Sequence, residues 1–277
     1  MQRIGFVLKR AEEKAVTLGE EISRFLVRSG KDVLLETSCE DLAAGWNAKT
    51  SDHICDDSDL LVVLGGDGTL LRAASLLNCK PTPILGVNLG RVGFIAETSP
   101  HEAIPELRSV MEGSAILVKR ILLQVTLPDG TTTRVLNDAV IHWGGIARII
   151  DLGIRVGRAR EIDLRADGLI VSTPIGSSAY SYAAHGPLVH PDIEAVLLTP
   201  ICPYAGLKRP LLVPPDVETD LILKKGEELM LTLDGRTTVP LNQGDTIRVQ
   251  RAPLPFVMVK SGNRDYFDVL KEKLGLL

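Results

Sequence analysis

The chain has 277 residues, 45% of them hydrophobic, and a formal net charge of −4 at pH 7. This composition predicts a globular protein, and the length allows one large core or two moderate ones, of which we favour two. Lysine and arginine are spread along the sequence rather than gathered in one stripe, so the charge pattern argues against a nucleic-acid partner.

Nothing in the sequence resembles a signal for export or a membrane anchor. Residues 1–10 contain a strand-like apolar run, Ile4–Leu8, that charged residues follow at once, which is unlike a secretory signal. No stretch reaches the roughly 18 apolar residues that a membrane-spanning helix needs. The cysteines lack C-x-x-C spacing and the histidines form no i, i+4 pair, so we expect reduced thiols and no metal held by protein side chains. We therefore expect a cytoplasmic protein without a membrane partner.

The first hundred residues predict alternating strands and helices. Ile4–Leu8 is an apolar strand, and apolar residues then recur at helical spacing over 15–26, with Gly30 placed as a C-terminal cap. Further short apolar strands follow at 33–35, 60–64 and 84–87. This alternation predicts an α/β domain with a parallel sheet.

A glycine turn, Gly65–Thr69, lies between the strand at 60–64 and a helical pattern. Such a turn at a helix N-terminus is a common anion site, yet Asp67 would repel a bare phosphate. Asp67 fits such a site if a cation lies between its carboxylate and the phosphate, or if the carboxylate faces a hydroxyl that is about to attack the phosphate. Both conditions describe a kinase. The turn is neither a dinucleotide fingerprint nor a Walker A loop, because Leu71 occupies the last glycine position. Taken alone, an ordinary acidic turn remains an equal alternative.

From about residue 100 the pattern changes to longer β runs. One helical segment over 99–113 contains Pro105, which we expect to delay or kink the helix. The runs at 115–127 and 131–142 flank Pro128-Asp129-Gly130 and predict a hairpin. Further strand-like runs follow at 149–156, 169–172, 211–213, 221–223 and 229–233, and Asp234-Gly235 forms another turn.

These patterns predict two domains. The first covers residues 1–100 together with the tail 251–277, and the second, a β-rich domain, covers 101–250. The tail contains an amphipathic helix at 265–274 whose apolar stripe consists of Phe267, Leu270 and Leu274. We expect this helix to pack back on the first domain.

Two later segments carry polar residues where a ligand could meet them. Asn137-Asp138 interrupts an apolar strand pattern, and since adjacent strand residues face opposite sides, one of the pair must point into protein and needs a partner. A ligand ribose or amide could be that partner; a bulge or a strand end is the alternative. The segment 167–180 runs from a strand into a turn rich in hydroxyls, where Tyr180 could stack on a base. Ordinary turn residues and a core tyrosine are the alternative there.

The combination of these segments resembles the NAD kinase family from Gly65 to about Gly244. The residues that carry the resemblance are Gly65-Gly66-Asp67-Gly68, Asn137-Asp138, Asp167-Gly168, Ser178-Ala179-Tyr180 and Thr199-Pro200. The resemblance implies a Rossmann-like α/β domain with a parallel sheet, a β-sandwich second domain, and a C-terminal helix that returns to the first domain. It also implies a homodimer or a homotetramer.

The implied activity is transfer of the γ-phosphoryl group of ATP, or of another phosphoryl donor, to the adenosine ribose 2′-hydroxyl of NAD, which gives NADP. Mg²⁺, or another divalent cation, would be carried with the ATP phosphates. By the same resemblance Asp67 is the catalytic proton acceptor. The implied substrate-binding residues are Gly68, Arg72, Asn137, Asp138, Arg148, Arg165, Asp167, Ile175, Ser178, Ala179, Tyr180, Ser181, Tyr182, Ala183 and Arg236. For a single arginine such as Arg148 or Arg165, a solvated surface charge is the alternative.

The sequence departs from the family pattern at four positions. Ile175 replaces the usual Thr, Ala183 the usual Ser and Arg236 the usual Gln, while His185 stands where Gly is common. Affinity and the preference between NAD and NADH therefore stay open. The sequence as a whole also leaves the phosphoryl donor open. Two alternative functions also stay open: a lipid or sugar kinase with the same turn, and a sensor that binds NAD without turnover.

Overall fold

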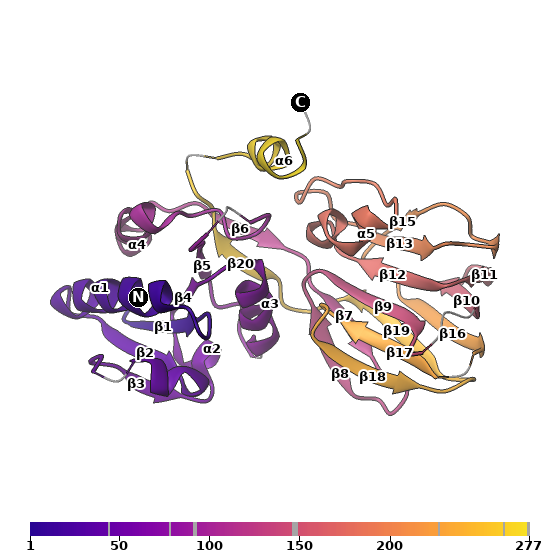
Figure 1. Cartoon of the computed structure of the whole chain (residues 1–277), viewed down its shortest axis with the longest axis horizontal. Coiled ribbons are helices and arrows are strands. Elements are labelled where there is room, and N and C mark those ends of the chain that lie inside the picture. The colour runs from indigo at the N-terminus through magenta and orange to yellow at the C-terminus, as the bar shows by residue number, and fades with distance from the viewer. Residues whose placement is uncertain are drawn as a thin grey trace. The chain divides into compact units, whose positions relative to one another are not determined.

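The computed structural model describes residues 1–43, 45–77, 79–90, 93–145, 149–226, 228–262 and 264–275. The chain divides into two compact units (Figure 1). The first unit comprises residues 1–120 and 256–277, and the second comprises residues 121–255.

The first unit is built on a seven-stranded sheet with the order β3-β2-β1-β4-β5-β20-β6. Neighbouring strands are parallel except for β20 and β6, which are antiparallel. Strand β4 is apolar and buried at every position, as a central strand covered on both faces must be. The strands are β1 (Arg3–Leu8), β2 (Asp32–Glu36), β3 (Lys49–Ser51), β4 (Leu60–Leu64), β5 (Ile84–Val87), β6 (Leu117–Arg120) and β20 (Phe256–Val259). The predicted Rossmann-like α/β domain is confirmed.

Helices connect these strands. Helix α1 buries Ala15, Ile22 and Leu26, which lie at the helical spacing that the sequence predicts. Pro105 neither delays nor kinks helix α4, because it lies in the first turn, where the helix needs no N–H from it. The helices of this unit are α1 (Glu13–Arg28), η1 (Thr37–Ala43), α2 (Ile54–Asp57), α3 (Asp67–Leu76), η2 (Pro100–Glu102), α4 (Ala103–Glu112) and α6 (Tyr266–Leu274).

The border of the first unit lies twenty residues beyond the border expected from the sequence. Residues 101–120 belong to it because Leu107 and Val110 of α4 join its core and β6 pairs with β20. Residues 251–255 belong instead to the second unit. The tail also contributes a strand that the sequence analysis did not anticipate: β20 extends the parallel sheet beside β5.

The C-terminal helix begins where the sequence predicts. The Asp265 side chain caps it by accepting a hydrogen bond of 2.8 Å from the Asp268 N–H. Val269 and Leu270 are buried, but Phe267 is 57% exposed, so the prediction that it belongs to a buried stripe is wrong. The apolar face of α6 is therefore narrower than the sequence pattern suggested.

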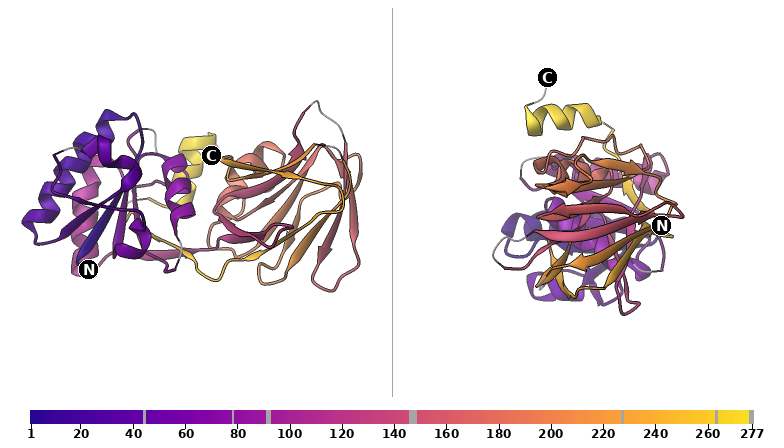
Figure 2. Two further views of the ribbon diagram at one scale, coloured as in Figure 1. Left: turned by 90° about the horizontal axis from the view of Figure 1, so that it is seen from below. Right: turned by 90° about the vertical axis from the view of Figure 1, so that its right-hand side faces the viewer.

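The second unit consists of two antiparallel sheets, and its strands can be followed in Figure 2. One sheet has the order β14-β11-β10-β16-β19-β7-β8 and the other has the order β15-β13-β12-β9-β17-β18. Buried residues from both sheets form one hydrophobic cluster, so the unit is the predicted β-sandwich.

The strands of the second unit alternate with turns along residues 123–251. They are β7 (Leu123–Thr126), β8 (Thr132–Val135), β9 (Asp138–Trp143), β10 (Ile150–Val156), β11 (Ile162–Ala166), β12 (Gly168–Ser172), β13 (Val196–Ile201), β14 (Ala205–Gly206), β15 (Leu211–Val213), β16 (Thr219–Lys225), β17 (Leu229–Leu233), β18 (Thr237–Leu241) and β19 (Thr246–Arg251). Two short helices, η3 (Ile175–Ser178) and α5 (Tyr180–Ala183), follow β12. The predicted hairpin is present as β7 and β8, whereas residues 138–142 of the second run belong to the other sheet.

We predict that Phe256→Ala destabilises the first unit by about 3 to 5 kcal/mol, because Phe256 is fully buried in the unexpected strand β20. Phe267→Ala is the matched control and should cost less than about 1 kcal/mol, since most of that ring is exposed. Urea unfolding followed by Trp46 fluorescence, in a Trp143→Phe background, measures both. Equal losses for the two variants would contradict the position of β20.

Candidate active site

The glycine turn lies at the point where the strand order of the first sheet reverses. The chain runs outward from β1 to β3 and then returns to β4, which pairs with the other edge of β1. In open α/β sheets, ligands bind at the carboxyl ends of the strands at such a switch point. The turn directly follows the carboxyl end of β4, where the Lys9 N–H also donates to the Leu64 carbonyl at 2.8 Å. The fold thus places Asp67 where a ligand site is expected.

The Asp67 carboxylate is held by a row of backbone amides. It accepts hydrogen bonds from the N–H groups of Phe94 at 2.8 Å, Ile95 at 3.1 Å and Ala96 at 3.1 Å. Asp67 is also the first residue of helix α3, where the helix dipole favours a negative charge. Asp67 as a whole residue is half-buried.

Two glycines of the turn are not required by packing within the protein. A Cβ atom at Gly66 or Gly68 would meet no atom within 4 Å among the described residues, and neither glycine has a left-handed φ. Gly65 differs, because its Cβ would lie 2.2 Å from the Thr69 hydroxyl. Open space beside Gly66 and Gly68 leaves room for another molecule to approach the backbone.

Arg72 is engaged inside the first unit. Its guanidinium forms an ion pair with Glu36 and donates to the Leu8 carbonyl at 2.8 Å and to the Ser38 hydroxyl at 3.3 Å. These bonds tie helix α3 to the ends of β1 and β2. The structure therefore gives Arg72 a structural role, and its contact with substrate stays a prediction.

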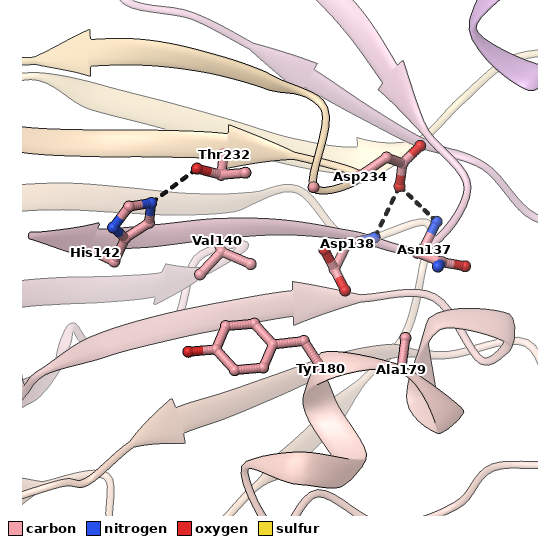
Figure 3. A pocket seen from close by; sticks show the side chains of 9 residues that line it. Asn137, Asp138, Val140, His142, Ala179, Tyr180, Thr232 and Asp234 are labelled. Atoms are coloured by element: carbon pink, nitrogen blue, oxygen red, sulfur yellow. Dashed lines mark hydrogen bonds between the residues drawn. The ribbon is translucent and has the colours of Figure 1, made fainter. Parts of the chain in front are cut away.

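The second unit contains a pocket of about 520 Å³ on the outer face of the sheet that includes β9 (Figure 3). Strand alternation explains this position: Ala139 and Ile141 point into the core, so Asp138 and His142 point outward. The volume suits a small-molecule site. The lining residues are Asn137, Asp138, Val140, His142, Ala179, Tyr180, Thr232, Asp234 and Gly235.

Asp234 holds the backbone at the start of β9. Its carboxylate accepts from the N–H groups of Leu136 at 3.0 Å, Asn137 at 2.7 Å and Asp138 at 3.1 Å. Asp234 and Gly235 have φ values of 48° and 63°, as the central residues of a type I′ turn between β17 and β18 must have. The turn geometry therefore aims the carboxylate at a neighbouring strand.

The segment after β12 also holds the backbone of residues 136–137, through hydrogen bonds to their carbonyl groups. The Thr173 hydroxyl donates to the Leu136 carbonyl at 2.5 Å, and the Thr173 N–H donates to the Asn137 carbonyl at 2.9 Å. A Cβ at Gly176 would lie 2.1 Å from the Asn137 carbonyl oxygen, so only glycine fits there. Part of the hydroxyl-rich composition thus serves the fold rather than a ribose.

The pocket contains two carboxyl groups in low-dielectric surroundings. Burial, with the charge of Asp234 as a smaller cause, raises the pKa of Asp138 to about 7. Burial also raises the pKa of Asp234, but its three backbone hydrogen bonds and the charge of Arg236 oppose that rise. Asp138 is therefore the carboxyl group of the pair that can hold a proton near neutral pH.

Other polar atoms in the pocket differ in whether they have partners. The buried Oδ1 atom of Asn137 has no hydrogen-bond partner among the described residues. His142 is already engaged, through Nδ1 with the Trp143 carbonyl at 2.8 Å and through Nε2 with the Thr232 hydroxyl at 2.8 Å. Tyr180 is 48% exposed and presents its ring beside the pocket (Figure 3). The pocket can thus contact a flat ring through Tyr180.

The structure brings together four of the predicted substrate-binding residues: Asn137, Asp138, Ala179 and Tyr180 all line the pocket. The other five lining residues were not predicted from the sequence: Val140, His142, Thr232, Asp234 and Gly235. Strand alternation from Asp138 could have found His142, and the Asp-Gly turn was the only signal for Asp234.

Other predicted residues of the segment 175–183 do not line the pocket as described. Ile175 is buried, and the Ser178 hydroxyl donates to its carbonyl at 3.1 Å. Ser181 is fully buried and shares a hydrogen bond of 2.8 Å with the Thr199 hydroxyl. Tyr182 and Ala183 are exposed.

The remaining predicted residues lie at the surface or outside the described residues. Arg165 pairs with Asp151 at 3.2 Å, and its guanidinium carbon lies 5.7 Å from the centre of the Tyr204 ring. Asp167 is half-buried just before β12, and Arg236 is exposed beside Asp234. Arg148 falls outside the residues that the structure describes.

Two properties of the described residues bear on cofactors and membranes. No three His, Cys, Asp or Glu side chains in this part of the chain come together in a group that could hold a metal ion. No helix within the described ranges is both long enough and apolar enough to cross a bilayer.

Comparison with known proteins gives a consistent match. The family described as ATP-NAD kinase N-terminal domain matches residues 4–115, and the family described as ATP-NAD kinase C-terminal domain matches residues 136–261. The NAD kinase of Geotalea daltonii is 39% identical over 280 residues, covering 99% of this chain and 98% of that protein. The NAD kinase of Geobacter metallireducens is 44% identical over 235 residues, covering 83% of each.

Solved structures agree with the sequence matches. Yeast NADH kinase complexed with NADH has a TM-score of 0.89 and 25% identity, covering 100% of this chain and 88% of that chain. An NAD kinase from Archaeoglobus fulgidus in complex with ATP has a TM-score of 0.80 and 27% identity, covering 100% of each chain.

We predict that Asp138 makes the second unit less stable as pH rises from about 4 to 7. Between the two pKa values the folded protein still holds the Asp138 proton that the unfolded chain has already released. The contribution of the protonated Asp138 to the free energy of unfolding is therefore complete below the unfolded pKa and is lost as pH rises through the folded pKa of about 7. Asp138→Asn keeps the side chain neutral and should gain about 1 to 4 kcal/mol over the wild type between pH 5 and pH 8.

Urea unfolding of both proteins, followed by Trp143 fluorescence, measures this difference. Asp129→Asn is the control, because hydrogen bonds from Thr131 lower the pKa of Asp129 and its titration lies below this window. Identical pH dependence for the wild type and Asp138→Asn would contradict the buried, proton-holding carboxyl group.

Proposed function

The chain belongs to the NAD kinase family, and we propose that its own residues bind NAD and direct a phosphoryl group to NAD in the way described below. As an NAD kinase, it transfers the γ-phosphoryl group of ATP to the adenosine ribose 2′-hydroxyl of NAD and forms NADP. The observation that carries the proposal is the amide-bound carboxylate of Asp67 at the switch point of the parallel sheet.

Asp67 would act on the attacking hydroxyl. A carboxylate offers about four lone-pair positions. Three of them are filled by the N–H groups of Phe94, Ile95 and Ala96, so about one remains for the ribose 2′-hydroxyl. The hydroxyl oxygen then forms a bond to the γ-phosphorus, the bond to the bridging oxygen breaks, ADP leaves, and Asp67 takes the hydroxyl proton.

Orientation would contribute more than basicity. The phosphoryl-transfer transition state is loose, so little proton removal is needed before the bonds to phosphorus rearrange. A carboxylate fixed by the backbone at a helix N-terminus is suited to aim an oxygen rather than to compete for its proton. The open space beside Gly66 and Gly68 would let the nucleotide come close to the turn.

We assign the pocket of the second unit to a nucleoside part of the dinucleotide. Asn137 lines the pocket and would hydrogen-bond the ligand, and the carboxyl groups of Asp138 and Asp234 are placed to meet hydroxyl or amino groups. Tyr180 would contact a flat ring. Arg165 and Arg236 lie at the surface of the same unit, and we keep them as candidate contacts for the negative charge of the dinucleotide.

A divalent cation would come with the donor phosphates, where it would offset their charge. The remaining lone pair of Asp67 is assigned to the ribose hydroxyl, and the described residues offer no cage of protein ligands, which fits Mg²⁺ held mainly by phosphate and water.

We also propose a cytoplasmic enzyme that assembles as a homodimer or homotetramer. Cys39, Cys55, Cys79 and Cys202 are all free thiols, which suits a reducing compartment. Tyr180 and Tyr182 expose aromatic rings on one short helix, as a surface covered by another subunit would.

We predict that Asp67→Asn lowers kcat for NAD phosphorylation by roughly 10²-fold or more, because the amide loses both the orientation that the three backbone N–H groups give the carboxylate and the ability to take the hydroxyl proton. The dissociation constant of NAD should stay within about twofold, since the proposed contact aims the hydroxyl and contributes little to binding. A coupled assay that scores NADP, together with calorimetric titration of NAD, measures both quantities. Asp52→Asn, at an exposed position, is the control. Near-wild-type turnover by Asp67→Asn with normal NAD binding would end the proposed role.

We predict that Asn137→Ala weakens NAD binding by roughly 5- to 30-fold, as expected when a ligand loses one buried hydrogen bond. Stability should be unchanged or slightly higher, because the variant removes an acceptor that has no partner among the described residues. Calorimetry and thermal melting check the two effects, with exposed Asn242→Ala as the control. Loss of stability with unchanged NAD affinity would contradict the assignment.

A further inference from the structure

Residues Gly93–Ala96, which lie between β5 and α4, curl around one side of the Asp67 carboxylate. Three consecutive N–H groups, those of Phe94, Ile95 and Ala96, point at its two oxygens. The Gly93 N–H donates to the Ala96 carbonyl at 3.2 Å and so curls this segment. Successive amides that converge in this way form a concave anion site, here filled by a side chain of the protein itself.

The base of this segment is fixed to the sheet. Val87, the last residue of β5, forms a parallel bridge with Thr98. The Asn88 N–H donates to the Thr98 carbonyl at 2.8 Å, and the buried Asn88 side chain donates to the Ala96 carbonyl at 3.4 Å. The amides that meet Asp67 are thus carried on a closed loop rather than on a free one.

Gly93 provides the space that the carboxylate occupies. A Cβ atom at Gly93 would lie 1.9 Å from Asp67 Oδ1 and 2.7 Å from Oδ2. The φ of Gly93 is not in the left-handed region, so its backbone conformation does not by itself require glycine. Any side chain at this position must displace the carboxylate, or the loop must move away from it.

We infer that residues Gly93–Ala96 form a positioning clamp for Asp67, which fixes the orientation of its carboxylate and leaves about one lone pair toward the substrate hydroxyl. The inference rests on the proposed role of Asp67 and adds to it a set of residues that act through its carboxylate. The clamp acts through Asp67, so its loss should lower kcat and leave NAD binding intact.

A double-mutant cycle between Gly93 and Asp67 tests the clamp. We expect Gly93→Ala to lower kcat by roughly 10- to 100-fold, because a small displacement of an orienting group is costly, with the NAD dissociation constant within about twofold. The double variant Gly93→Ala with Asp67→Asn should match Asp67→Asn alone within about twofold, because no carboxylate is left to misplace. Gly262→Ala is the control, since the same methyl group there meets open space.

Each contrary result is distinct. If Asp67→Asn loses turnover while Gly93→Ala keeps it, the clamp is overturned and the role of Asp67 survives. If the double variant falls below Asp67→Asn by the factor that Gly93→Ala causes alone, the two residues act independently and the clamp is overturned. If Asp67→Asn keeps full turnover, both the proposed role and the clamp fall.

Hydrogen exchange tests the clamp without altering Gly93. In Asp67→Ala the amides of Phe94, Ile95 and Ala96 lose their acceptor, and we expect their exchange to speed up by roughly tenfold or more. The Asn88 amide, bonded to the Thr98 carbonyl, should stay within about threefold of the wild type. Unchanged exchange at residues 94–96 would overturn the clamp even if Gly93→Ala did not fold.

Discussion

In each unit, one aspartate carboxylate accepts hydrogen bonds from three consecutive backbone N–H groups and so fixes the backbone at the candidate site. Asp67 does this for residues 94–96, and Asp234 does it for residues 136–138. In both cases the acid stands beside a glycine in a tight turn at the end of a strand. Charge-assisted hydrogen bonds of this kind are stronger than neutral ones, so each aspartate fixes a neighbouring segment of backbone as well as its own side chain.

Asp67 and Asp234 have different roles. The amide partners of Asp67 lie in a loop, and Asp67 itself is half-buried. The amide partners of Asp234 lie at the start of a strand, and their positions place the Asn137 and Asp138 side chains at the pocket. Strand alternation then separates the apolar core of the sandwich from its polar outer face, so the pocket forms without disturbing the core.

The sequence predicts the parts of the fold that depend on local pattern. The apolar run of β4 and the glycine turn after it lie where expected, as does the hairpin of β7 and β8. The prediction was wrong where long-range pairing overrides local pattern. Strand β20 forms because it pairs with β5, which lies far away in the sequence. Residues 131–142 divide between two sheets because Asp234 holds the backbone between β8 and β9.

In the candidate site, too, the residues that follow a local pattern could be predicted, and those that depend on long-range contacts could not. Asn137, Asp138 and Tyr180 could be proposed from local composition, and the family match supports the activity over a lipid kinase, a sugar kinase or a silent sensor. The partnership of Asp234 with Leu136 spans 98 residues of sequence and leaves no local signal beyond an Asp-Gly turn. The same holds for Gly93, whose need for glycine appears only when the Asp67 carboxylate is seen to occupy the space of its side chain.

A crystal structure of the protein with NAD bound would test the central claim most directly, through the distance between the Asp67 carboxylate and the adenosine ribose 2′-oxygen. The account predicts a hydrogen bond of about 2.6 to 3.2 Å, with the amides of residues 94–96 still on the carboxylate. A ribose hydroxyl bound elsewhere, with Asp67 facing no part of the dinucleotide, would contradict it.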